Sequence, residues 1–132
     1  MNIAAQIVVG LVAFIHLYIL WLEMFAWTTR APKVFKGYPA EYFPKTVTLA
    51  ANQGLYNGFL AAGLIWSFFI SDPIWSANVA YFFLVCVAVA GLYGAVTAQK
   101  KILFVQTIPA IVGILFVYFG ILGMGNNAKY SI

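Results

Sequence analysis

Charged side chains are scarce in this sequence. Of its 132 residues, 3 are Asp or Glu and 7 are Lys or Arg, so charged residues make up 8% of the chain. A water-soluble domain carries about 25%. Hydrophobic residues make up 64% and aromatic residues 18%. Too few polar side chains are present to cover a globule in water, so the composition predicts an integral membrane protein in contact with a lipid bilayer.

Other scarcities exclude several kinds of chemistry. Cys86 is the single cysteine, so the chain forms no intramolecular disulfide and no cysteine metal cluster. One histidine with one intramembrane carboxylate makes a poor metal site, since zinc takes at least three protein ligands. No glycine-rich loop ends in Lys-Ser or Lys-Thr, so we expect no phosphate-binding loop. The seven Lys and Arg lie in short connections, which argues against a nucleic-acid partner. We therefore expect no metal and no cofactor.

The apolar residues fall into four runs, each near the roughly 20 residues that a helix needs to cross a bilayer. The first lacks the basic start of a signal peptide and is interpreted as a retained span. Strands are disfavoured because an open sheet edge cannot face lipid. The prediction is a single all-α domain, residues 1–132, forming a four-transmembrane-helix bundle. Its spans are 3–27, 47–70, 74–98 and 102–123, with a basic loop at 28–46.

The basic residues predict the orientation of the bundle. With four spans, the first and third connections lie on one side of the membrane, and together they hold six of the seven Lys and Arg. The other side has Lys129 alone. The positive-inside rule places both basic loops in the cytoplasm and both termini outside.

Two ionisable residues, His16 and Glu23, lie inside the first apolar run. Seven residues at about 100° each place them within roughly 20° of one helical face, about 10 Å apart along the axis. An ionisable group inside a membrane span costs roughly 2.5–3.5 kcal/mol, so such groups usually face a protein interior or a wet cavity. We expect any specific chemistry to involve this face.

Polar residues at matching depth follow in the second span. Counted inward from the same interface at about 1.5 Å per residue, Asn52 and Gln53 match Glu23, and Asn57 matches His16. An antiparallel hairpin therefore predicts two polar layers, Glu23 with Asn52 or Gln53 and His16 with Asn57.

A purely structural role is the main alternative for these residues. Asn and Gln often hold membrane helices together through hydrogen bonds worth about 0.6–2 kcal/mol. Five polar side chains at two depths exceed what helix packing needs, which favours a ligand- or proton-binding site. Secondary candidates are Tyr56, Gln106 and Thr107, the last two beside Pro109, where we expect a kink.

The segments HLYILWLEMF (residues 16–25) and AANQGLYNGFLA (residues 50–61) resemble the signature segments of the domain of unknown function 1304 family. The resemblance covers nearly the whole chain. It implies a small bacterial four-span protein of the inner membrane, strengthens the expected fold, and singles out His16, Glu23, Asn52, Gln53 and Asn57. The family name carries no established activity.

Three functions remain open from the sequence. In the first, the protein binds or exports a small lipophilic molecule, with Glu23 alternately holding a proton and a cationic substrate, and so small a transporter is expected to work as a homodimer. In the second, Glu23 and His16 form the acid/base pair of an intramembrane enzyme acting on an isoprenoid or sterol-like lipid. In the third, the protein is a non-catalytic accessory subunit whose polar layer fixes helix register.

Overall fold

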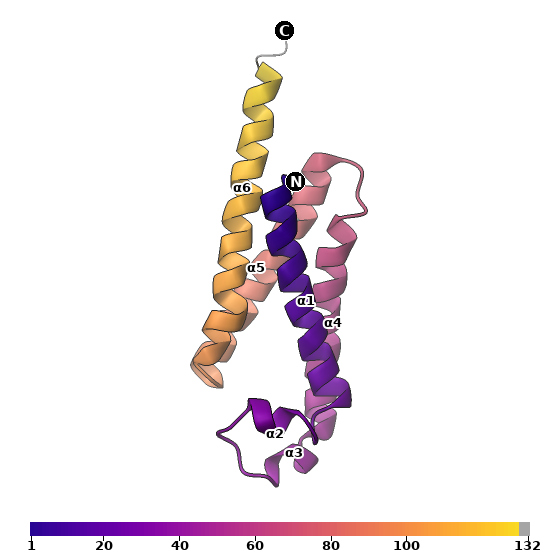
Figure 1. The fold of residues 1–132 in the computed structure, drawn as a ribbon, viewed down its shortest axis with the longest axis vertical. Coiled ribbons are helices and arrows are strands. Elements are labelled where there is room, and N and C mark those ends of the chain that lie inside the picture. Colours follow the sequence, from indigo (N-terminus) through magenta and orange to yellow (C-terminus); the bar gives the residue numbers. More distant parts are fainter. Residues whose placement is uncertain (130–132) are drawn as a thin grey trace.

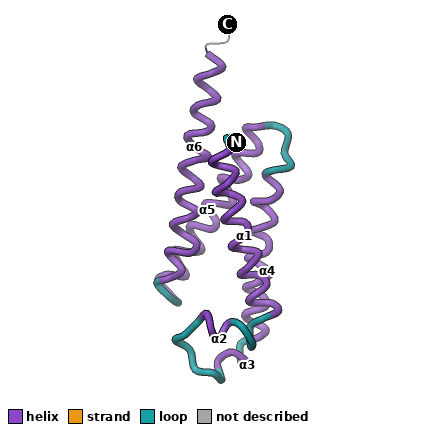
Figure 2. The backbone as a smooth tube through the Cα atoms, viewed as in Figure 1, coloured by secondary structure: helices purple, strands orange, loops and turns teal. Residues whose placement is uncertain are grey.

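All elements of the described chain are helices (Figures 1 and 2). A computed structural model describes residues 1–129, with side chains up to residue 123. The elements in order are α1 (Ile3–Phe25), α2 (Ala31–Val34), α3 (Tyr42–Lys45), α4 (Val47–Ser67), α5 (Pro73–Thr97), the π-helix η1 (Leu103–Thr107) and α6 (Ile108–Lys129). The all-helical class expected from composition is confirmed. The side chain of Lys129, the cation expected outside, lies beyond the described side chains.

Three helical stretches are long and apolar enough to cross a membrane, namely Ile3–Phe25, Pro73–Thr97 and Leu103–Gly123. α4 is long enough at 21 residues but less apolar, because three side-chain amides, Asn52, Gln53 and Asn57, lower its hydropathy. Large apolar side chains are exposed along all four long helices. Such a surface is stable against lipid rather than water, so the protein is a small helical membrane protein.

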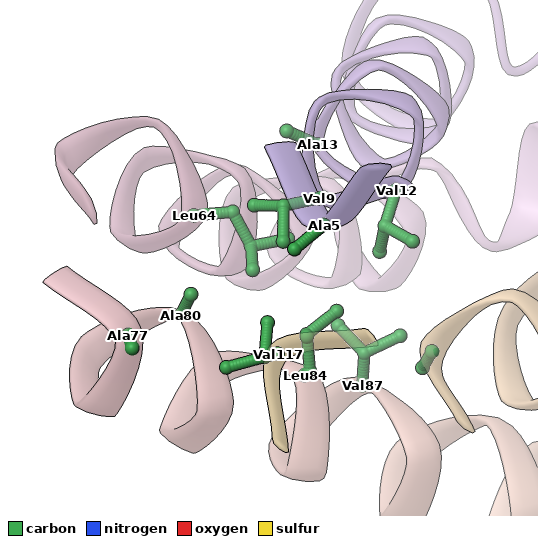
Figure 3. Close-up of a cluster of buried hydrophobic side chains, with 11 residues drawn as sticks. Ala5, Val9, Val12, Ala13, Leu64, Ala77, Ala80, Leu84, Val87 and Val117 are labelled. Carbon is green, nitrogen blue, oxygen red and sulfur yellow. The ribbon is translucent and has the colours of Figure 1, made fainter. Parts of the chain in front are cut away.

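The four long helices pack in a ring, with α1 and α5 each contacting both α4 and α6. The main core lies at the end of the bundle that holds the N-terminus, and Figure 3 shows its side chains meeting between the helices. It combines small and branched residues: Ala5, Val9, Val12, Ala13, Leu64, Ala77, Ala80, Leu84, Val87, Ala110 and Val117. Alanines at this contact let the helices approach closely. The bundle is therefore closed at this end.

Two glycines set the contact between α1 and α4. A Cβ added to Gly54 would lie 2.7 Å from Cγ of Met24 and 3.0 Å from Cβ of Glu23, and one added to Gly58 would meet Leu20. These positions have room only for hydrogen, so the two helix backbones come unusually close. Gly54 and Gly58 thus fix the register in which α4 packs against α1.

In the turn between α4 and α5, side chains form hydrogen bonds with the backbone groups left unpaired at the helix ends. Asp72 caps α5, its Oδ1 accepting from the backbone N–H of Ile74 at 2.9 Å and of Trp75 at 2.8 Å. Ser76 Oγ donates to the carbonyl of Ser67 at 2.8 Å, so a carbonyl left free by the end of α4 is paired inside the protein. These bonds hold α4 and α5 as a tight antiparallel pair.

Pro109 is preceded by a π-helix rather than a simple kink. The backbone N–H of Ile108 bonds to the carbonyl of Leu103, five residues back. This wider turn interrupts the α-helical hydrogen-bond pattern directly before a residue that has no N–H to donate. Thr107 Oγ1 lies 3.5 Å from the carbonyl of Ala88, and the space beside Gly91 is filled by Thr107 and Gln106. η1 is therefore packed closely onto α5.

The glycine contact yields a stability prediction. Gly54→Ala places a methyl group against Met24, Glu23 and the carbonyl of Leu20, so we expect overpacking to lower the free energy of unfolding by about 1–3 kcal/mol. Gly123→Ala is the matched control, because a Cβ there meets nothing within 4 Å. Reversible unfolding in mixed micelles measures both. An unchanged Gly54→Ala variant would contradict the close contact.

Candidate functional site

A cavity of about 440 Å³ lies at the end of the bundle opposite the main core. Its walls come from the end of α1, the first half of α4, the last turns of α5 and the η1 segment, and its floor from the α2–α3 connection. In Figure 1 this is the lower end, where α5 and α6 stand apart from α1 and α4 above α2 and α3. Pockets of this volume hold small-molecule ligands in other proteins.

Glu23 and Asn57 form the polar centre of the cavity wall. Asn57 Nδ2 donates to Glu23 Oε2 at 3.0 Å and to the backbone carbonyl of Gln53, also at 3.0 Å. Both neighbours only accept, so the amide group of Asn57 must point its two N–H bonds at them. Gln53 and Gln106 line the same cavity from α4 and from η1. Three of the five principal candidates and one secondary candidate are thus brought together.

The predicted layers were wrong. Glu23 pairs with Asn57, not with Asn52 or Gln53, and His16 does not pair with Asn57. Depths were counted as if α1 and α4 met the interface at the same level. The structure instead places Gly54 beside Met24, so α4 extends more than a turn beyond the end of α1. This offset brings Asn57 level with Glu23 and leaves Asn52 lower, on an exposed position.

Aromatic residues form the floor of the cavity. Trp27, Phe35, Tyr38 and Tyr42 all line it. Tyr38 stacks on Tyr42 with ring centroids 4.5 Å apart, and Trp27 contacts both Phe35 and Tyr42. Beneath them Leu22, Ala26, Ala31 and Phe43 make a second small core that anchors the connection to α1. The connection therefore folds against the bundle and forms one wall of the cavity.

Polar contacts tie this floor to the walls. Trp27 Nε1 donates to Thr46 Oγ1 at 3.0 Å, and Thr46 Oγ1 donates to the carbonyl of Tyr42 at 2.8 Å. Across the cavity, Lys101 donates to the carbonyl of Val34 and places its ammonium 4.9 Å from the centre of the Phe35 ring. The turn after α5 is thus clasped to the connection between α1 and α4, 67 residues away in the chain.

His16 lies apart from the cavity. It is fully buried, and its Nδ1 donates to the carbonyl of Val12 at 2.9 Å. Its Nε2 is buried with no hydrogen-bond partner in the described part of the chain. Only Ile19, one turn further along α1, and then Glu23 reach the cavity. The shared helical face expected for His16 and Glu23 therefore spans from the closed core to the open end.

The remaining candidates divide by exposure. Thr107 is buried against α5, outside the cavity lining. Tyr56 is 60% exposed and, like Asn52, faces away from the cavity. Within the described residues, no three His, Cys, Asp or Glu side chains gather as a metal site would require.

Sequence reasoning missed the aromatic floor as part of the site. Phe35, Tyr38 and Tyr42 were not among the site residues predicted from the sequence, and they line the cavity. The available signal was their density beside Trp27 in one connection of the chain. These residues reach the cavity because the connection folds back against the end of the bundle. Residue spacing in the sequence does not predict this fold-back.

The fold defines a small helical membrane protein, and its described residues enclose a cavity with polar side chains on one wall. A family model described as protein of unknown function (DUF1304) matches residues 10–118. The chain belongs to this family. The uncharacterised protein YpaA of Lactococcus lactis subsp. lactis (strain IL1403) is 34% identical over 121 residues, covering 90% of this chain and 100% of that protein. No solved structure matches.

The Glu23–Asn57 contact can be measured by a double-mutant cycle on unfolding. We expect Glu23→Ala and Asn57→Ala to couple by about 1–2 kcal/mol, because a charged hydrogen bond inside a membrane protein reaches the upper end of the measured range. Glu23→Ala combined with Asn52→Ala is the control, expected to be additive within about 0.5 kcal/mol. If Glu23 coupled to Asn52 and not to Asn57, the result would contradict the hydrogen bond seen in the structure and support the pairing predicted from equal depths.

Proposed function

We propose that the protein binds a small lipophilic molecule in the cavity beside Glu23. The observation that carries this proposal is a half-buried carboxylate on the wall of a cavity of about 440 Å³ whose other walls are largely apolar and aromatic. Ligand pockets combine such walls with a few polar groups that orient the ligand. A purely structural polar layer has no need of the adjoining space.

Transport is the extension of this proposal that the shape of the molecule favours. The cavity is closed towards the N-terminal end by the main core and lies at the opposite end of the bundle. A carrier that alternates between two openings presents such an arrangement in one of its states. A homodimer of so small a carrier is part of this proposal.

The enzyme hypothesis is less well supported by the geometry. An acid/base pair must reach the same bound substrate. Glu23 lines the cavity, whereas His16 is fully buried outside its lining. Binding therefore takes precedence over catalysis in the proposal.

The proposed orientation has four spans, with α4 as the second span, both termini outside and the cavity at the cytoplasmic side of a bacterial inner membrane. α4 is supported as a span by its 21 residues and by its packing along α1 and α5. Its amide side chains at Gln53 and Asn57 line the cavity, which reduces their contact with lipid.

Cysteine labelling of intact cells tests the orientation. In a Cys86→Ala background, an impermeant maleimide is expected to label Ser71→Cys at the outer turn and to leave Lys100→Cys unlabelled until the membrane is opened. The reverse pattern would place the cavity on the outer side, and labelling of both sites in intact cells would overturn the four-span arrangement.

Binding is tested with the neutral fluorescent probe N-phenyl-1-naphthylamine and protein in lipid nanodiscs. Ala90→Phe adds a ring at a position on the cavity wall and is expected to weaken probe binding about tenfold or more, equivalent to at least about 1.4 kcal/mol of lost contact.

The matched control is Val89→Phe, which adds the same ring at the neighbouring position, 63% exposed and outside the cavity lining. It is expected to bind the probe as the unaltered protein does. Equal binding by both variants and by empty nanodiscs would contradict the proposed function.

A further inference from the structure

We infer that the ligand of this cavity is a lipophilic monocation, an ammonium or related cation carrying an apolar body. The inference rests on the proposed ligand-binding function and adds the chemical class of the ligand. It also rests on the Glu23 carboxyl group, which has no cationic partner among the described residues, and on the aromatic side chains that line the same cavity.

Several donors around the cavity are already engaged. The two amide N–H bonds of Asn57 go to Glu23 and to the carbonyl of Gln53. The indole N–H of Trp27 goes to Thr46, whose hydroxyl in turn donates to the carbonyl of Tyr42. Thr97, also on the cavity wall, donates its hydroxyl to the carbonyl of Tyr93 at 2.8 Å. Other donors of the cavity have no such partner among the described residues, including the side-chain amides of Gln53 and Gln106 and the hydroxyls of Tyr38, Tyr42 and Tyr93, so hydrogen-bond donors alone do not select the charge of the ligand.

Charge is the feature of the cavity that selects a ligand, because Glu23 is the only Asp, Glu, Lys, Arg or His among the described residues that line it. Glu23 has one hydrogen-bond partner among the described side chains, the neutral amide of Asn57, and no Lys or Arg of the described chain pairs with it. A carboxylate has about four acceptor positions, and Asn57 uses one of them. Because Asn57 donates through its nitrogen, its own carbonyl oxygen also remains an acceptor. With Glu23 ionised, the centre of the wall therefore offers a single negative charge, with no compensating Lys or Arg among the described residues, to a guest with a single positive charge.

The aromatic floor suits the same guest. Aromatic faces attract cations through the ring quadrupole within about 6 Å of the centroid. Trp27, Tyr42 and Tyr93 line the cavity along with Glu23. The protein already uses this interaction at the rim, where the Lys101 ammonium lies 4.9 Å from the centre of the Phe35 ring. A ligand with an ammonium near Glu23 and an apolar body against these rings uses both features together.

The test uses two probes of matching shape and opposite charge, tetraphenylphosphonium and tetraphenylborate, as competitors of N-phenyl-1-naphthylamine in nanodiscs. We expect tetraphenylphosphonium to displace the neutral dye and tetraphenylborate to fail. Glu23→Gln keeps the size of the side chain and removes its charge. Dye binding by this variant is measured directly, and displacement by tetraphenylphosphonium, relative to that dye affinity, is expected to weaken about 10-fold or more, because the cation loses a partner of opposite charge.

Two further variants keep the test decisive. Tyr56→Phe, off the cavity, is expected to behave as the unaltered protein. Adding Gln53→Glu to Glu23→Gln returns a carboxylate to the same wall and is expected to recover part of the displacement by the cation. This recovery separates charge recognition from a change of shape.

The outcomes separate this inference from the function on which it rests. If the dye binds in the cavity and both ions displace it equally, or only the borate does, the site binds lipophilic molecules and the cation class is wrong. If cation displacement survives Glu23→Gln undiminished, Glu23 does not recognise the charge and the inference also falls. If no probe binds above empty nanodiscs, the proposed function and the inference fall together.

Discussion

The close contact between α1 and α4 determines where the polar residues of this protein meet. Gly54 and Gly58 leave no room for a side chain against Leu20, Glu23 and Met24, so the two helices can pack only in one register. In that register Asn57 reaches the Glu23 carboxylate while its second N–H bonds to the carbonyl of Gln53. A slip of one turn would separate the Asn57 amide from the Glu23 carboxylate, and only the bond of Asn57 to the carbonyl of Gln53, which lies within α4, would remain.

The two ends of the helix bundle differ: the end that holds the N-terminus is filled by the main core, and the opposite end holds the cavity. Alanine and branched residues bring the four long helices together around the main core (Figures 1 and 3). On one side of the cavity the π-helix η1 packs closely onto α5. On the other side α4 packs closely onto α1 through Gly54 and Gly58. The aromatic connection covers the space between these two pairs and is held there by Lys101 and Trp27.

Much of this could be predicted from the sequence. Apolar runs gave the long helices, and the cost of ionisable groups in lipid singled out Glu23 and its amide neighbours. The pairing of residues could not be predicted, because depth counting assumes that both helices begin at one level and the glycine contact shifts α4 by more than a turn. His16 was grouped with Glu23 because helical periodicity reports a shared face. Periodicity does not show how far along α1 the cavity extends. His16 lies beyond the end of the cavity and is fully buried. The role of Phe35, Tyr38 and Tyr42 depends on a fold-back of the connection that no local pattern specifies.

The most direct measurement is a solid-state NMR dipolar coupling in lipid bilayers between the side-chain carboxyl carbon of Glu23 and the side-chain amide nitrogens of the asparagines. Single replacement of Asn52 and of Asn57 assigns the signal. A hydrogen bond of 3.0 Å between Asn57 Nδ2 and Glu23 Oε2 predicts a strong coupling that disappears when Asn57 is replaced and persists when Asn52 is replaced. A coupling that disappears with Asn52 instead, or no coupling at all, would contradict the register on which the cavity and its proposed ligand depend.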